Sequence, residues 1–252
     1  SVVGISTDNT LDVLSTTRGH NKYHMSTISP YVEWQLDSLG KKVTINYSYI
    51  NVGDDINQHY TSESDLSFSH STNNYSFVVN TVNADANLPF NWLTFELGGK
   101  YSHFRTNSHS LFDIASGFLY RETINAFYAD VNHSFGPLYV KAGVRYEHTK
   151  DEGLTIEGIK TNRKYANWFP FVNLSYNPND DHSFSLGYSK HINRPSMNEV
   201  NPTHVYSDTY HYTEGNPSLK PSIMENLEFN YVFKGNLSVD LYYYHTSDGS
   251  MP

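Results

Sequence analysis

The chain has 252 residues, of which 26 are acidic, 17 are basic and none is cysteine, giving a formal charge of −9. This charge argues against a nucleic-acid partner, which favours a basic surface, and the lack of cysteine excludes disulfides and thiolate-bound metals. A membrane helix is excluded as well, because no run of about 18 apolar residues occurs. Aromatic residues nevertheless reach 15%, while the mean hydropathy is −0.56. Such a chain is typical of strands with one apolar and one polar face.

The first residues show no secretory signal, because Ser1 is followed by neither a basic nor a long apolar stretch. Residues 5–22 are rich in small polar residues and predict a loop. From residue 28 onward the main signal is alternation of apolar and polar residues, which indicates half-buried strands. Clear alternation covers 28–36, 43–49, 93–101, 140–147, 184–189, 227–233 and 237–243, and weaker strand patterns cover 75–86, 120–134 and 167–176. We therefore predict about ten strands.

Short and long connections alternate between these strands. The short ones contain Gly, Pro, Asn or Asp, which suit tight turns, and they cover 37–40, 87–91, 135–137, 177–181 and 234–236. The long ones cover 53–74, 107–119, 151–166 and 192–221. In an up-and-down sheet this places every short turn at one end and every long loop at the other, as in outer-membrane barrels. The pattern predicts an all-β, antiparallel, up-and-down transmembrane β-barrel and favours it over a soluble sandwich.

The alternation also predicts which side chains meet lipid. On a transmembrane barrel the apolar residues face outward and the polar residues face the lumen. The outward set is Val140, Val144, Phe184, Leu186, Phe229, Leu241 and Tyr243, and the inward set is Lys141, Arg145, Ser185, Glu228 and Asp240. Charges of both signs on the polar faces suit an interior held by ion pairs.

Residues that could carry catalysis or bind a metal form no recognisable pattern. The 13 histidines make no His-Glu-x-x-His motif, and the best local group is His204, Asp208 and His211 in the last long loop. No Gly-x-Ser-x-Gly motif or glycine-rich phosphate loop occurs. Asp180 and Asp181 are adjacent, but they occupy a predicted turn, where Asp is common. We expect no enzyme activity, no bound metal and no cofactor.

The segment 188–221 stands apart because four prolines interrupt it and predict an extended, turn-rich loop. Its sequence resembles TonB-dependent outer-membrane receptors, and in particular the outer membrane protein β-barrel family. The matching positions are Arg194, Pro195, Asn201, Pro202, Gly215, Asn216, Pro217, Leu219 and Pro221. Weaker similarities at 36–42, 142–147 and 167–170 extend the resemblance over most of residues 24–246. Because the nine motif positions are typical of the whole family, we interpret them as structural.

The resemblance implies a place in the cell outer membrane of a Gram-negative bacterium, contact with membrane lipid, and TonB-driven import of a scarce or bulky nutrient. Receptors of this kind have an N-terminal plug, a short TonB-contacting motif and a barrel of about 22 strands. Neither plug nor motif is recognised in this chain. We therefore expect residues 1–252 to form a single unit, an internal segment of such a barrel, with TonB bound through regions absent from this chain.

The sequence is also compatible with two other functions. One is a small stand-alone outer-membrane barrel with an adhesin or structural role, which would require pairing between 24–36 and 237–246. The other is a soluble all-β glycan-binding domain whose loop tyrosines stack on sugars. The candidate ligand-facing residues, all in the last long loop, are His204, Tyr206, Asp208, Tyr210, His211 and Tyr212.

Overall fold

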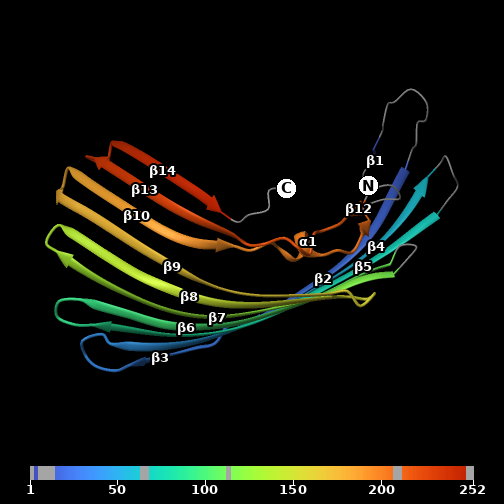
Figure 1. Ribbon diagram of the computed structural model, residues 1–252, viewed down its shortest axis with the longest axis horizontal. Coiled ribbons are helices and arrows are strands. Elements are labelled where there is room, and N and C mark those ends of the chain that lie inside the picture. Colours follow the sequence, from blue (N-terminus) through green and yellow to red (C-terminus); the bar gives the residue numbers. More distant parts are fainter. Residues whose placement is uncertain (1–2, 5–14, 63–67, 112–114, 207–211, 248–252) are drawn as a thin grey trace.

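The computed structural model describes residues 3–4, 15–62, 68–111, 115–206 and 212–247. Within them, twelve strands form one continuous antiparallel sheet that is strongly curved (Figure 1). These strands are β1 (Val3–Gly4), β2 (Ser15–Ile28), β3 (Tyr31–Gln35), β4 (Lys42–Ser62), β5 (Phe68–Pro89), β6 (Thr94–Leu111), β7 (Ala115–Phe135), β8 (Leu138–Thr155), β9 (Lys160–Asn179), β10 (His182–Asn193), β13 (Ser222–Phe233) and β14 (Leu237–Ser247). A short helix, α1 (Met197–Val200), and a separate pair, β11 (Val205–Tyr206) and β12 (Tyr212–Thr213), lie between β10 and β13.

The strands of the large sheet pair in chain order, β1-β2-β4-β5-β6-β7-β8-β9-β10-β13-β14, with β3 beside β4. Both β2 and β3 pair with β4 and are separated only by Ser29 and Pro30, so they behave as one interrupted strand. Counted in this way, and without the two-residue β1, the sheet has ten long strands, which confirms the prediction. The described long strands form one sheet in chain order without a Greek-key crossover, so the two-sheet arrangement of a sandwich is not observed among them.

Five short turns lie at the same end of the sheet, on the left of Figure 1, and cover 36–41, 90–93, 136–137, 180–181 and 234–236. Two of them contain only two residues, and in the one that follows β7, Gly136 has a φ of 58°. This left-handed conformation is open to glycine at little steric cost and lets the chain reverse within two residues. The predicted placement of the short turns is confirmed.

The opposite end differs from the prediction. β4 continues to Ser62 and β5 begins at Phe68, so most of the predicted loop 53–74 is paired strand. β6 and β7 extend into 107–119, β8 and β9 extend into 151–166, and β2 covers 15–22, all of which were predicted as loop. The hydropathy pattern fails here because these strand ends are mostly polar on both faces, while the backbone ladder continues regardless of hydropathy.

The concave face of the sheet is identified by α1, which lies on it (Figure 1). Met197 and Val200 of α1 pack against Phe118 and Tyr120 of β7. Since side chains alternate along a strand, every second residue of β7 from Phe118 onward shares the concave face. The strand register then extends this face to the neighbouring strands.

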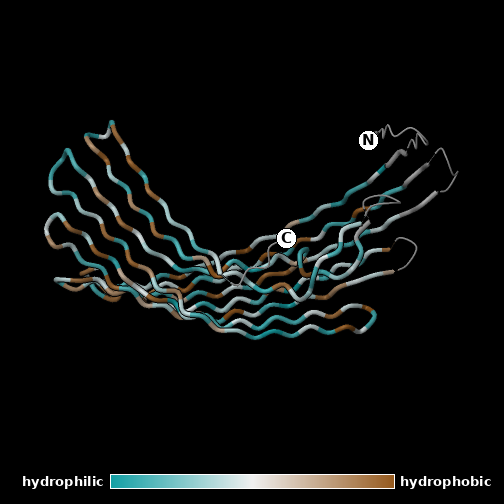
Figure 2. The backbone as a smooth tube through the Cα atoms, turned by 45° about the horizontal axis from the view of Figure 1, so that its top comes forward, coloured by the Kyte–Doolittle hydropathy of each residue, from teal (hydrophilic) through white to brown (hydrophobic). Residues whose placement is uncertain are grey.

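The register places Arg145 opposite Tyr128 and Lys141 opposite Asn132, so both cations lie on the concave face, as predicted. Val140 and Val144 therefore lie on the convex face. Figure 2 shows the resulting alternation of hydrophilic and hydrophobic residues along the strands. Large apolar side chains that remain exposed on the convex face include Phe127, Val144, Trp168, Leu186, Leu241 and Tyr243. An apolar outer face around a polar inner face is the arrangement of a membrane barrel wall.

The sheet is open within the described residues. β14 pairs with β13, while β2 and β3 pair with β4, and no pairing joins β14 to β2 or β3. The pairing of 24–36 with 237–246 that a small stand-alone barrel requires is therefore not observed. A second opening lies inside the sheet, because β10 pairs with β9 only from His182 to Ser189 but with β13 as far as Asn193. Beyond Ser189, the chain leaves β9.

No helix among the described residues is long and apolar enough to cross a membrane.

Replacing Leu241 by arginine tests the assignment of the convex face to lipid. Leu241 is 60% exposed and lies near the middle of β14. An arginine on the lipid face near the bilayer midplane should lower the free energy of unfolding by about 2–4 kcal/mol. Guanidine unfolding of the protein reconstituted in phospholipid measures this change. The matched control is Tyr242→Arg, which lies next to Leu241 at a similar depth but on the concave face, and equal losses for the two variants would contradict the assignment.

Candidate functional site

The concave face carries a network of ion pairs. The Lys141 ammonium lies 2.9 Å from a carboxylate oxygen of Glu96 and 3.1 Å from one of Asp130. The Arg145 guanidinium lies 2.6 Å from the carboxylate of Glu147. Pairing with opposite charges offsets much of the cost of removing these groups from bulk water. The mixed charges seen in the sequence therefore hold the inner wall together across β6, β7 and β8.

Arg194, the first residue after β10, connects the following segment to this wall. Its Nη2 donates hydrogen bonds to the Glu147 carboxylate and to the Thr149 hydroxyl, the latter at 3.1 Å. Glu147 therefore accepts from two guanidinium groups, those of Arg145 and Arg194, and it is 8% exposed. Because β10 has already separated from β9, this contact brings the chain back over the concave face of β8. We call residues 194–204 and 212–221 the returning segment.

The returning segment opens with a capped helical turn. Ser196 and Glu199 form a capping box, in which the Ser196 hydroxyl accepts from Glu199 N and the Glu199 carboxylate accepts from Ser196 N at 2.7 Å. This backbone hydrogen bond holds the pKa of Glu199 below its ordinary value. The helix was not predicted, although the Ser-x-x-Glu spacing at 196–199 is a recognised helix signal. Capping directs Met197 and Val200 into the cluster with Phe118 and Tyr120.

The Gly-Asn-Pro run closes the segment against α1. Gly215 N donates to the Asn201 carbonyl at 2.6 Å, and Asn216 N donates to the Glu199 carbonyl at 2.7 Å. A Cβ on Gly215 would lie 2.5 Å from the carbonyl oxygen of Asn198, so only glycine allows this approach. The Asn201 side-chain oxygen accepts from both the backbone N and the hydroxyl of Thr203.

The end of the returning segment is attached to the wall by a second arginine. Arg163 of β9 donates Nε to Asp151 at 3.0 Å and Nη1 to the Leu219 carbonyl. Leu219 also packs against the cluster formed by Phe118, Tyr120, Met197 and Val200. The motif prolines, all half-buried, are Pro195, Pro202, Pro217 and Pro221. The structure thus joins Asn201, Gly215, Asn216 and Leu219 around α1 and attaches Arg194 to β8.

The six predicted ligand-facing residues are only partly described. The His204 ring lies 4.1 Å from the Tyr212 ring between centroids, and His204 Nε2 lies 3.4 Å from the Glu214 carboxylate. Tyr206 belongs to β11 and pairs with Tyr212, but its side chain is outside the described residues. Asp208, Tyr210 and His211 also lie outside them. The ligand-facing role of these six residues stays a prediction.

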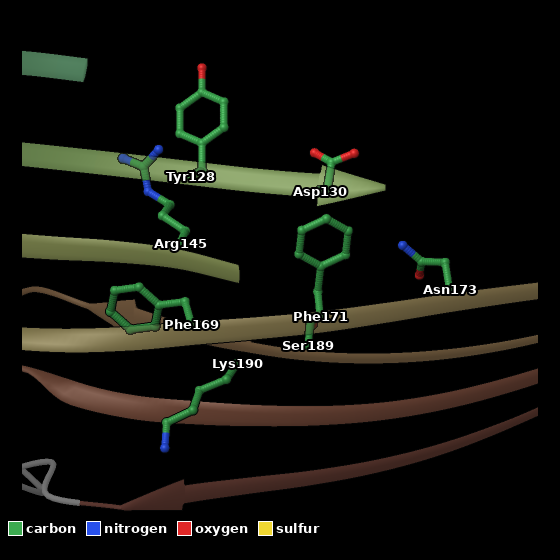
Figure 3. Close-up of a pocket in the computed structure, with 8 residues that line it drawn as sticks. All are labelled: Tyr128, Asp130, Arg145, Phe169, Phe171, Asn173, Ser189 and Lys190. Carbon is green, nitrogen blue, oxygen red and sulfur yellow. The ribbon is translucent and has the colours of Figure 1, made fainter. Parts of the chain in front are cut away.

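Two pockets on the concave face were not predicted. The first has a volume of about 440 Å³ and lies where β10 leaves β9 (Figure 3). It is lined by Tyr128, Asp130, Arg145, Phe169, Phe171, Asn173, Ser189 and Lys190. Its cations are already engaged, because Arg145 pairs with Glu147 and Lys190 pairs with Glu225 at 3.2 Å.

The second pocket lies between the returning segment and the wall, with a volume of about 480 Å³. It is lined by Tyr75, Phe77, Val79, Ser102, Phe104, Tyr120, Glu122, Arg194, Pro195, Ser196, Met197 and Asn198. Its aromatic lining was missed because an inward-facing aromatic contradicts the polar-inside pattern. One feature of the sequence could have indicated it: residues 120–134 carry apolar side chains on both faces of the strand, including the face expected to be polar.

An open, antiparallel, up-and-down sheet with an apolar convex face and an ion-paired concave face defines the wall of an outer-membrane β-barrel. The model of the outer membrane protein beta-barrel family matches residues 34–251. The chain belongs to this family and is located in the outer membrane. No curated protein matches the chain.

Solved outer-membrane receptors share this fold. The siderophore receptor PiuA from Acinetobacter baumannii has a TM-score of 0.58 and 11% identity, covering 90% of this chain and 40% of that one. The ferric-catecholate import receptor Fiu from E. coli K12 has a TM-score of 0.55 and 10% identity, covering 90% of this chain and 41% of that one. The unliganded ferric citrate transporter FecA has a TM-score of 0.53 and 13% identity, covering 84% of this chain and 32% of that one. The chain therefore spans about a third to two fifths of the length of these receptors.

Proposed function

We propose that this chain forms part of the wall of a TonB-dependent transporter that imports a scarce or bulky nutrient across the outer membrane. The observation that carries the proposal is the open sheet, whose two edge strands do not pair with each other within the described residues. An open edge at membrane depth exposes unpaired backbone groups, so such a wall needs further strands to close it. Membership of the barrel family and the likeness to siderophore and ferric citrate receptors support the proposal.

In this proposal the concave face lines the inside of a wider barrel. The returning segment lies at the end opposite the short turns, which in outer-membrane barrels is the external end. A ligand arriving from outside would meet this segment before the ion-paired wall around Lys141. TonB would act through regions outside this chain, and membrane lipid would contact the convex face.

The proposal is tested by uptake in cells that lack the protein. We expect the deletion to abolish uptake of one member of a labelled panel containing ferric siderophores, cobalamin, glycans and peptides. Removal of TonB should abolish the same uptake, because the outer membrane has no energy source of its own. Complementation with the wild-type protein is the control. Unchanged uptake across the panel, together with lost cell adhesion, would instead favour the adhesin alternative.

A further inference from the structure

The pocket between the returning segment and the wall has an unusual lining for the inside of a barrel. Rings from three neighbouring strands follow one another across it, with centroid distances of 6.0 Å from Tyr75 to Phe77, 6.0 Å from Phe77 to Phe104 and 6.2 Å from Phe104 to Tyr120. Barrel interiors are generally polar. Tyr75, Phe104 and Tyr120 also belong to, or pack against, the cluster with Met197 and Val200, so this run of rings extends from the cluster under α1 into the open pocket.

Glu122 places one carboxylate within this aromatic lining. The register sets it directly beside Phe104 on β6 and beside Asp151 on β8. Its one hydrogen bond among the described residues is accepted from the Tyr120 hydroxyl at 3.3 Å. The ion pairs of the described residues do not include Glu122.

The two cations nearest to Glu122 are directed to other partners. Arg194 also lines the pocket, but its Nη2 donates to Glu147 and Thr149. Arg163 donates to Asp151 and to the Leu219 carbonyl. The half-buried Glu122 carboxylate therefore forms no direct ion pair among the described residues, and the nearby charges of Arg194 and Arg163, which attract it, are shared with Glu147 and Asp151.

We propose that this pocket binds a small organic cation, such as a quaternary ammonium group. Glu122 would supply the opposite charge, and the rings of Phe77, Phe104 and Tyr120 would attract the cation through their π faces. The volume of about 480 Å³ lies within the range of small-molecule pockets. The returning segment forms the other wall of the pocket, so a bound cation would also contact α1.

The experiment measures binding of cations to the purified protein in a nonionic detergent by ligand-observed NMR titration. The probes are tetramethylammonium, choline and benzyltrimethylammonium, compared with acetate and with 3,3-dimethylbutan-1-ol, the uncharged counterpart of choline. We expect saturable binding of at least one cation, weaker binding of the alcohol and none of acetate. Glu122→Gln should weaken cation binding about tenfold or more without changing that of the alcohol.

Glu152→Gln is the matched control. Glu152 lies on β8 next to Asp151, but on the opposite face, where it pairs with Lys150 at 2.7 Å. Cation binding should be unchanged in this variant. If Glu122→Gln fails to fold, Glu122→Asp keeps the charge and should keep the preference for choline over the alcohol.

Three results would overturn the proposal: no saturable cation binding by folded wild-type protein, equal affinity for choline and the alcohol, or unchanged cation affinity in folded Glu122→Gln. The pocket goes beyond the proposed transport role and is tested without transport. A failure here therefore leaves the uptake experiment to decide that role separately.

Discussion

Replacing Gly215 by valine should separate the Gly-Asn-Pro run from α1 and loosen the returning segment while leaving the sheet folded. A Cβ at this position would lie 2.5, 2.6 and 2.7 Å from the carbonyl oxygens of Asn198, Glu199 and Asn201, respectively. These are backbone atoms of the capped turn and cannot rotate away. Overpacking of this kind costs about 1–3 kcal/mol or more. The population in which the Gly-Asn-Pro run has separated from α1 should therefore rise about tenfold or more.

A single introduced thiol measures this release, because the chain contains no cysteine. Met197 is 8% exposed within the cluster under α1, so Met197→Cys should react slowly with a maleimide. Adding Gly215→Val should speed the reaction about tenfold or more. Gly19→Val is the control, because a Cβ there would lie 3.5 Å from its nearest neighbour on Gln58. Equal labelling rates with and without Gly215→Val would show that the close approach does not hold the segment.

The membrane-facing part of the fold could be predicted from the sequence because the two faces of its strands meet different solvents. Along 140–147, every second residue is apolar where it meets lipid, and Lys141 and Arg145 fall between them. At the strand ends opposite the short turns, the two faces no longer meet different solvents, and the alternation is lost. The residues from Asp54 to Ser62 are mostly polar, yet they pair in register with β2 and β5. Nothing in their hydropathy distinguishes such a strand from a loop, so the strand lengths could not be predicted.

The candidate site could be predicted only in part, for a different reason. The motif positions around Arg194 and Gly215 could be recognised as a pattern, but their partners could not. Glu147 lies 47 residues before Arg194 in the chain and reaches it only because of the register of β8 and the separation of β10 from β9. The pocket containing Glu122 depends on the same return of the chain. Contacts between residues this far apart in the chain depend on the assembled sheet, and a single sequence carries no local signal for them.

Glu147→Gln should have the second large effect, because one carboxylate holds both Arg145 and Arg194. Glutamine keeps the size of the side chain but removes its charge, leaving two guanidinium groups near a site that is 8% exposed. Breaking a buried ion pair in this way costs about 3–5 kcal/mol. The free energy of unfolding in phospholipid vesicles should fall by about that amount. The three tryptophans, Trp34, Trp92 and Trp168, are all exposed and can report the loss of lipid contact by fluorescence.

The control for this variant is Glu225→Gln, which removes the carboxylate of the more exposed pair with Lys190. An exposed pair contributes about 0–1 kcal/mol, so this variant should unfold almost like the wild type. A double-mutant cycle with Arg194→Met then separates the coupling between Glu147 and Arg194 from general damage to the wall. If the returning segment is held by this pair, the two losses should be strongly non-additive, since either change alone breaks the contact. Additive losses would mean that Arg194 stabilises the segment through packing, and that the carboxylate serves Arg145 alone.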